Sequence, residues 1–438
     1  MDQPKNDSVA GPLSQFGPGR VLIVGTLDTK GEEVLFLKNC LAAAGVNPLV
    51  VDVGVLGEPQ FEPDVKRGEI AVCAGESVEE LRRAADRGRA VAAMHRGFAA
   101  WVRSCRDREL PAGVLAIGGS AGTAIATAGM RELPIGIPKV MVSTMASGDV
   151  RPYVGTSDLC MMYSVADFAG LNRLTRTILS NAAHAVAGMC VFSDKQAPRS
   201  ERPLLAATMF GVTTPCVQRV QELLERQGYE LLVFHATGTG GQAMEKLVRD
   251  GFVKGVLDIT TTELADELVG GVLTAGPHRL EAAGEVGVPQ VISVGALDMV
   301  NFGAPETVPE RFRGRRFYQH NPAVTLMRTT PEENGRLGQI LAEKASAAKG
   351  RVTVILPLGG VSAIDSDAKA FYDPAADSVL FEAIRGHLKA NVKLVEVDCH
   401  INDPGFADRI VAEFLAMAPF RTAAAAPNDA STLEKTIC

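Results

Sequence analysis

Short apolar runs alternate along the chain with amphipathic stretches of helical length. The first run, 21–25, is followed by a helix-like segment, by Ala44 and Gly45, and by a second apolar run that ends at Asp52. Apolar runs of this length bounded by turn residues are typical of buried strands. A strand, a glycine turn, an amphipathic helix and another strand form the pattern of a parallel sheet with crossover helices.

The middle of the chain repeats this pattern. The apolar run 204–211 leads into a helix-like segment at 218–226, then Gln227 and Gly228, and then a run that ends at His235. Two later pairs of segments also correspond in the same order, namely 113–119 with 255–261 and 136–143 with 287–294. The recurrence predicts an internal duplication of one α/β unit, and the alternative is a pair of unrelated α/β domains.

The fold class that follows is α/β, with parallel sheets flanked by helices. The predicted strands are 21–25, 48–53, 113–118, 138–143, 204–210, 230–234, 255–259, 290–294, 352–356 and 393–397. The predicted helices are 31–44, 77–93, 121–130, 158–190, 215–227, 241–250, 277–285, 332–346, 378–389 and 404–417. Residues 298–330 show no clear periodicity, which predicts a long irregular loop of the kind that is often functional or disordered.

Composition divides the chain and excludes some functions. Residues 1–19 and 421–438 are expected to be disordered tails, and the polar segment 193–202 is expected to link domains at 20–192 and 203–420. The net charge of −7 and the absence of a basic stripe argue against nucleic acid as a partner. Eight scattered cysteines without a C-x-x-C pair indicate a reducing compartment. With no spanning segment or signal peptide apparent, we expect a cytoplasmic protein without a membrane partner.

Ligands of open parallel sheets bind beyond the carboxyl ends of the strands, so the first strand-end loop is a candidate site. The loop 25–33 offers small residues, two hydroxyls and one lysine for a phosphate, through Gly25, Thr26, Thr29 and Lys30. Asp28 is a candidate metal residue, because Mg²⁺ favours carboxylates together with phosphate oxygens. The loop is not a Walker A sequence, and a capped helix start with a solvated lysine is the alternative.

The second candidate loop follows the strand predicted at 113–118. Three glycines and two hydroxyls in six residues suit an anion-binding nest, and its candidate residues are Gly118, Gly119, Ser120, Gly122 and Thr123. The alternative is that these glycines serve only close helix–strand packing. A third loop, 143–149, is rich in hydroxyls, and Asp52 occupies the position of a ribose-binding acid at an unusually long spacing.

The second half carries acidic residues at predicted strand ends. Asp258, Glu263 and Asp298 would converge if their strands were neighbours, and His278 begins a helix from which it could reach a ligand. These four residues are the catalytic candidates, and helix caps or turn residues are the alternative. A basic and polar group in the aperiodic stretch is expected either to bind an anionic ligand or to be solvated, and it comprises Arg311, Arg313, Arg315, Arg316, His320, Asn321 and Arg328.

The loops 25–33 and 118–123 together resemble those of the ATP-binding family typified by the tomato mosaic virus resistance protein. The resemblance extends from about Arg20 to about Pro419, and Ala121 departs from it where glycine is expected. It implies two Rossmann-like domains, ATP with Mg²⁺ on the N-terminal one, and a homodimer. It assigns the nucleotide to Gly25, Thr26, Asp28, Thr29, Lys30, Gly118, Gly119, Ser120, Gly122 and Thr123.

Three functions are therefore open. The first is a two-domain protein that binds ATP and Mg²⁺ on its N-terminal loops. The second is an enzyme that uses a nucleotide on a small acidic metabolite held in a C-terminal cleft, with the four catalytic candidates converging on one pocket. The third is a regulatory or interaction module in which ATP only stabilises the fold or the dimer.

Overall fold

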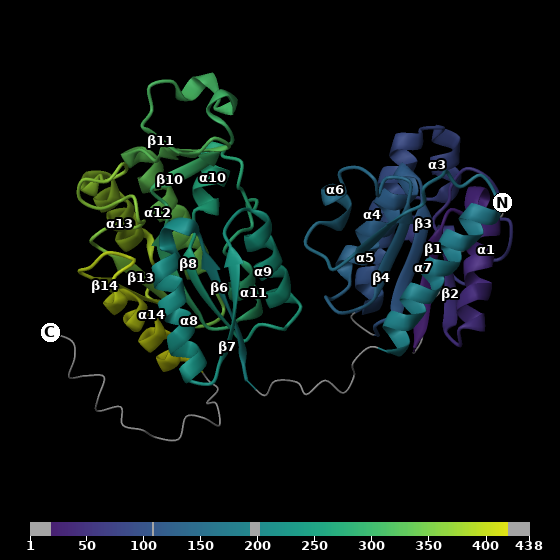
Figure 1. The fold of residues 1–438 in the computed structure, drawn as a ribbon, viewed down its shortest axis with the longest axis horizontal. Coiled ribbons are helices and arrows are strands. Elements are labelled where there is room, and N and C mark those ends of the chain that lie inside the picture. The colour runs from purple at the N-terminus through teal and green to yellow at the C-terminus, as the bar shows by residue number, and fades with distance from the viewer. Residues whose placement is uncertain (1–18, 107–108, 193–201, 419–438) are drawn as a thin grey trace, which may run out of the picture. The chain divides into compact units, whose positions relative to one another are not determined.

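The computed structural model describes residues 19–106, 109–192 and 202–418, and it separates into two compact units, Met1–Ala197 and Pro198–Cys438 (Figure 1). The predicted tails and linker lie outside the described residues, apart from residues 19 and 202. Each unit is a parallel sheet flanked by helices on both faces, which confirms the predicted α/β class.

The N-terminal sheet has five parallel strands in the order β2-β1-β3-β4-β5. These strands are β1 (Arg20–Gly25), β2 (Asn47–Asp52), β3 (Gly113–Gly118), β4 (Lys139–Ser143) and β5 (Cys160–Tyr163). Successive side chains of β1 point to opposite faces of the sheet. Val21 and Ile23 therefore belong to the core on one face, and Leu22 and Val24 belong to the core on the other face.

Helices leave this sheet toward opposite faces. Apolar residues of α1 (Leu27–Ala43) and α7 (Arg173–Val191) share the core of Val21 and Ile23. The other core is covered by α4 (Arg87–Arg106) and α5 (Ser120–Glu132). Two short helices precede α4, namely α2 (Arg67–Cys73) and α3 (Val78–Ala84), and a third short helix, α6 (Arg151–Val154), lies between β4 and β5. Thus the helices after β1 and β3, α1 and α5, lie on opposite sides of neighbouring strands.

The C-terminal sheet repeats this order and extends it by one strand, as β14-β13-β9-β8-β6-β7. Its strands are β6 (Leu204–Met209), β7 (Glu230–His235), β8 (Gly255–Thr260), β9 (Gln290–Gly295), β13 (Val352–Pro357) and β14 (Val392–Val397). In both sheets the first strand lies next to one edge, with the second strand on its outer side and the third strand on its inner side. This shared order is what an internal duplication predicts.

The helices of the C-terminal unit also divide between two faces. One core is covered by α8 (Thr214–Arg226) and α14 (Pro404–Met417). The opposite face packs against the remaining helices, α9 (Thr239–Arg249), α10 (Glu263–Val269), α11 (Ala282–Val286), α12 (Pro331–Ser346) and α13 (Pro374–His387).

The prediction of an irregular loop at 298–330 is wrong in part. This segment contains an antiparallel sheet in the order β10-β12-β11, formed by β10 (Met299–Phe302), β11 (Phe317–Asn321) and β12 (Val324–Arg328). All five residues of β11 are exposed. The sequence of this strand therefore lacks the alternation of apolar and polar residues that predicts a half-buried strand. The 3₁₀ turns Pro305–Thr307 and Glu310–Phe312 fill the connection between β10 and β11.

The predicted helix 158–190 begins too early. Residues 160–163 form β5, which pairs with β4, and the helix starts only after Asn172, whose side chain accepts hydrogen bonds from the N–H groups of Leu174 and Thr175. Asp158 does not cap it, since its carboxylate accepts from Gly136 N at 2.7 Å and from Lys139 Nζ at 2.6 Å. Likewise, 77–93 divides between α3 and α4, and 277–285 is helical only in its last part.

Candidate functional site

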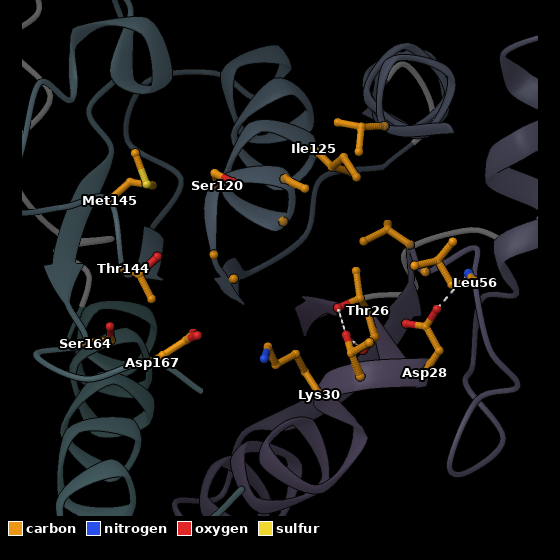
Figure 2. A pocket seen from close by; sticks show the side chains of 18 of the residues that line it. Thr26, Asp28, Lys30, Leu56, Ser120, Ile125, Thr144, Met145, Ser164 and Asp167 are labelled. Carbon is orange, nitrogen blue, oxygen red and sulfur yellow. Dashed lines mark hydrogen bonds between the residues drawn. The ribbon is translucent and has the colours of Figure 1, made fainter. Parts of the chain in front are cut away.

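A cavity of about 640 Å³ in the N-terminal unit lies at the carboxyl ends of β1 and β3. This is the point where the strand order reverses, because β2 lies on one side of β1 and β3 on the other. Sheets of this order bind ligands at that point. The cavity brings together the two loops that the sequence singled out, 25–30 and 118–122 (Figure 2).

The loop after β1 forms its own turn before α1 becomes regular. The N–H groups of Thr29 and Lys30 both donate to Thr26 O, at 3.0 and 2.7 Å, and the backbone of Lys30 is not helical. The hydroxyls of Thr26 and Thr29 are 2.8 Å apart on the cavity wall. Gly25 lets the helix approach, since a Cβ there would lie 2.7 Å from Val34 Cγ2. The loop therefore presents two hydroxyls and one lysine on a compact turn.

The loop after β3 brings the start of α5 against the strand. A Cβ on Gly118 would lie 2.7 Å from Gly122 Cα, so only glycine permits this approach. The first intrahelical bond runs from Thr123 N to Gly119 O at 2.8 Å, and the N–H groups before it have no acceptor within the helix. Those N–H groups belong to residues that line the cavity, Ser120, Ala121 and Gly122.

Thr123 faces the protein interior instead of the cavity. Its side chain is fully buried, and its hydroxyl lies 2.6 Å from the hydroxyl of Ser143 at the end of β4. This bond ties the first turn of α5 to the neighbouring strand. The predicted nucleotide role of Thr123 can therefore only be indirect, through the position of α5.

Lys30 and Asp28 leave the same loop in different directions. Figure 2 shows Lys30 reaching across the cavity toward Asp167, and its Nζ donates to Phe168 O and lies 5.8 Å from the ring centroid of Phe168. The Asp28 side chain is only 3% exposed, and its Oδ2 accepts from the N–H groups of Leu56 and Gly57 at 2.9 and 3.1 Å. Asp28 thus anchors the loop that follows β2.

The predicted metal role of Asp28 remains a prediction. Its Oδ1 has no hydrogen-bond partner in the described residues, and this atom is buried. Those residues also contain no group of three or more histidines, cysteines and carboxylates that could hold a metal ion. A cation in this cavity would therefore need most of its oxygen ligands from a bound molecule and from water.

Asp52 is an organising residue of the cavity rather than a ribose ligand. Its fully buried carboxylate accepts from Leu27 N at 3.1 Å, from Gly54 N at 2.9 Å and from Arg67 Nε at 2.6 Å. It thereby connects the loop after β1, the loop after β2 and α2. Arg67 was missed from the sequence, because nothing in its spacing distinguishes it from a surface arginine.

The cavity has an apolar side that the sequence did not predict. Its apolar wall comes from three separate segments, with Val53, Val55 and Leu56 after β2, Ala90 and Val91 on α4, and Ile125 on α5. Further residues come from the ends of β4 and β5, including Thr144, Met145, Tyr163, Ser164 and Asp167. Only tertiary packing brings these segments together.

In the C-terminal unit, Arg279 pairs with Asp258 on β8 and with Glu263 at the start of α10. Its fully buried guanidinium donates two bonds of 2.6 Å to Asp258 and one of 2.5 Å to Glu263. Burial lowers the pKa of Arg279, but the carboxylates of Asp258, Glu263 and Glu245 hold it well above its usual value. Two catalytic candidates are thus brought together, but in a buried ion cluster.

Asp258 and Glu263 also bind the surrounding strand ends. The Thr208 hydroxyl donates to Asp258 at 2.7 Å, and Glu263 accepts from Gly238 N and Gly241 N at 2.7 and 3.1 Å. Their oxygens are therefore engaged with β6 itself and with the residues that follow β7.

The other two catalytic candidates lie elsewhere. His278 is 81% exposed and pairs with Glu281 at 2.9 Å. Asp298 is fully buried, accepts from the Ser362 hydroxyl at 2.7 Å and lies in a cluster around Arg328. Burial raises the pKa of Asp298 to about 7, against the influence of Arg328. The four candidates do not share one pocket.

The basic group predicted in 298–330 is also divided. Arg328 is buried and bonds to Asp377 at 2.6 Å, and Arg315 bonds to Glu333 at 2.7 Å. His320 and Asn321 lie on the exposed strand β11. These residues therefore do not form one anion-binding surface.

Comparison with known proteins identifies the family. Residues 19–195 match the N-terminal domain of the uncharacterised protein family UPF0261, and residues 202–418 match its C-terminal domain. The chain belongs to UPF0261. None of the helices in the described residues of this UPF0261 chain is both long and apolar enough to cross a membrane.

Relatives are found in bacteria and in a plant. A UPF0261 protein of Clostridium tetani is 51% identical over 91% of this chain and 98% of its own length. One from Rhizobium meliloti is 49% identical over 91% of this chain and 99% of its own length. The ToMV resistance protein Tm-1 of Solanum lycopersicum is 42% identical over 93% of this chain, which spans 57% of that protein.

The close approach at Gly118 gives a first prediction. Gly118→Ala should lower the free energy of unfolding by about 1–3 kcal/mol, because the new Cβ meets backbone atoms of Gly122. Gly119→Ala is the control, since its Cβ would meet nothing closer than Thr144 Oγ1 at 3.7 Å and should change stability by less than about 0.5 kcal/mol. Urea unfolding measures both, and equal losses would contradict the account.

The ion cluster gives a second prediction. Arg279→Met should destabilise this UPF0261 protein by about 3–5 kcal/mol, because it leaves Asp258 and Glu263 buried without their cation. The half-exposed Arg385, which pairs with Glu396, is the control, and Arg385→Met should cost less than about 1 kcal/mol. Urea unfolding followed by circular dichroism compares the two, and a small loss for Arg279→Met would refute a stabilising role.

The buried acids give a third prediction, on pH. Burial raises the pKa of Asp298 to about 7 and that of Asp377 to about 8, whereas an unfolded aspartate titrates near 3.9. Between about pH 5 and pH 8 the folded chain therefore holds protons that the unfolded chain releases, and stability falls as pH rises, by up to about 1.4 kcal/mol per pH unit for each group.

The test is urea unfolding at several pH values. Asp298→Asn should reduce the slope of unfolding free energy against pH, whereas Asp408→Asn, at the surface pair with Arg219, should leave it unchanged. Equal slopes for the wild type and Asp298→Asn would contradict this account of Asp298.

Proposed function

We propose that this protein binds ATP, together with Mg²⁺, in the cavity between β1 and β3. The observation that carries the proposal is the convergence of the loops 25–30 and 118–122 on one cavity at the point where the strand order reverses. Both loops lead from a strand into a helix, which is a common arrangement for binding phosphate.

The phosphates would lie at the polar end of the cavity. The cavity wall includes the residues whose N–H groups open α5, the hydroxyls of Thr26 and Thr29, and Lys30. The start of α5 carries a partial positive charge from its aligned peptide dipoles. These donors and charges suit an anion with several oxygens, and they provide no partner for a purely apolar ligand.

The base and ribose would lie toward the apolar wall formed by Val53, Val55, Leu56, Ala90, Val91 and Ile125. A volume of about 640 Å³ is in the range of cavities that enclose small organic ligands. A polar end and an apolar wall in one cavity match the two halves of a nucleotide. The choice of ATP among nucleotides rests on the resemblance of the two loops to the ATP-binding family.

The two alternative functions receive less support from the geometry. An enzyme acting through Asp258, Glu263, His278 and Asp298 needs these groups to face one substrate, but two are held by Arg279, one is buried and one is at the surface. A regulatory role for ATP, a homodimer and a cytoplasmic location remain compatible with the proposed binding and are predictions of the same resemblance.

The proposal predicts a thermal shift with ATP. At a hundredfold excess over the dissociation constant, ATP with Mg²⁺ should stabilise the binding unit by about 2.7 kcal/mol, which corresponds to a rise of several degrees in its unfolding temperature. ADP, GTP, NAD⁺ and coenzyme A, each with and without Mg²⁺, establish the preference. Absence of any shift with ATP would contradict the proposal.

Lys30→Met tests the site itself. Loss of one charged hydrogen-bond donor should weaken ATP binding about tenfold or more. Lys38→Met, on the same helix but not on the cavity wall, is the matched control and should bind like the wild type. Isothermal titration calorimetry measures both, and equal affinities would place the nucleotide elsewhere.

A further inference from the structure

The segment 163–168 borders the cavity on the side opposite to the loop after β1. It follows β5, and Tyr163, Ser164, Val165, Ala166 and Asp167 all line the cavity. The sequence analysis assigned this stretch to the interior of a helix and gave it no role. Three of its features point to a ligand: a strained backbone, an unpaired carboxylate and a contact with Lys30.

The backbone is strained at Val165. This residue has a φ of +63°, and Ala166 N donates to Ser164 O at 2.7 Å, so the three residues form a tight γ-turn of the positive-φ type. A β-branched residue is unfavourable in that region. Val165 is also 58% exposed, so burial of its side chain does not offset the strain. Such strain occurs where the backbone must present a particular group.

The group that follows the turn is the carboxylate of Asp167. Figure 2 shows it pointing into the cavity toward Lys30. One oxygen, Oδ1, accepts from Phe168 N at 2.8 Å, and in the described residues no lysine, arginine or histidine lies within ion-pair distance of Asp167. The Lys30 ammonium donates instead to Phe168 O. The second oxygen of Asp167 is therefore available on an exposed side chain.

A carboxylate in this position opposes the binding of a phosphate. Two negative groups held close together near a protein surface repel each other, because water screens them only in part. A divalent cation between them reverses this effect, since Mg²⁺ is commonly held by one or two carboxylates together with phosphate oxygens and water.

Asp28, the other acid on the cavity wall, is less suited to this task. Its Oδ2 already accepts from two N–H groups of the loop after β2, and its Oδ1 is buried against Gly54. Mg²⁺ gives up its water reluctantly and keeps several water ligands, so it needs an accessible carboxylate. The side chain of Asp167 is accessible, whereas that of Asp28 is 3% exposed.

We propose that Asp167 is the protein ligand of the divalent cation that accompanies the bound nucleotide. This assignment rests on the proposed ATP binding and adds to it the residue that holds the metal. The remaining ligands would be phosphate oxygens and water, and Asp28 would keep the loop after β2 in place. The turn at Val165 then serves to direct Asp167 toward the phosphates, and the bond from Lys30 to Phe168 holds the two sides of the cavity together.

The experiment compares the wild type, Asp167→Asn and Asp28→Asn. Titration calorimetry measures ATP binding by each full chain in EDTA and in excess Mg²⁺. Electron paramagnetic resonance counts Mn²⁺ bound in the presence of ATP. The Asp167→Asn variant keeps an oxygen acceptor for Phe168 N, and the side chain of residue 167 is exposed. This variant should therefore retain the wild-type unfolding temperature.

The expected result separates the two acids. In Asp167→Asn, ATP binding in EDTA should be equal to the wild type or tighter, because a repulsive charge is gone. The gain in affinity that Mg²⁺ gives the wild type should fall at least about tenfold, and Mn²⁺ should bind to the complex of protein and ATP more weakly than in the wild type. Asp28→Asn should keep the ratio between the affinity in Mg²⁺ and the affinity in EDTA, although both affinities and its unfolding temperature should fall as the loop after β2 loses an anchor.

Two results would overturn the assignment in different ways. If Asp167→Asn keeps the full Mg²⁺-dependent gain while the wild type binds ATP, then the cation is held elsewhere and only this inference fails. If the wild type binds ATP neither in EDTA nor in Mg²⁺, the proposed function fails and the assignment fails with it.

Discussion

The structure of the N-terminal unit depends on one topological constraint, the reversal of strand order at β1. The helix after β1 packs on one face of the sheet and the helix after β3 packs on the other, so the ends of two neighbouring strands are left without a covering element. Everything proposed here about binding follows from this opening, because it places two helix starts and their preceding loops around one cavity. Buried polar residues hold the elements around this opening in place. Asp52 joins the loops after β1 and β2 to α2, and Thr123 connects α5 to β4.

The C-terminal unit shows that the same topology does not lead to the same site. Its sheet reverses order between β6 and β8, but there the buried guanidinium of Arg279 binds Asp258 and Glu263. In the N-terminal unit, by contrast, Lys30 reaches into an open cavity. Both units contain a buried ion pair near this point, Asp52 with Arg67 in the N-terminal unit, but there Lys30 also lies on the wall of a cavity. Function must therefore be argued for each site separately.

The periodic parts of the sequence predicted the fold well. Apolar runs and glycine stops were sufficient for the parallel sheets, because buried parallel strands and amphipathic helices each have a simple pattern. The failures occurred where that pattern is absent. Strand β11 is entirely exposed, β5 is a short edge strand, and both are defined by hydrogen bonds to a neighbour that no local signal reveals.

The site was predictable only in its local parts. Glycines and hydroxyls next to strands marked the loops 25–30 and 118–122, and the structure brings these together. The apolar wall, Arg67 and Asp167 come from distant segments, so their roles depend on tertiary packing. The acids Asp258, Glu263 and Asp298 were correctly placed near strand ends, but sequence alone could not show that they are buried with arginines.

Hydrogen exchange of the full chain with and without ATP and Mg²⁺ is the most direct test of the central claim, that a nucleotide binds where the strand order reverses. The account predicts slower exchange at the backbone amides of residues 26–30 and 118–123, and at 163–168 when Mg²⁺ is present. Protection confined to the C-terminal unit, or no protection at these loops at saturating ATP, would contradict it.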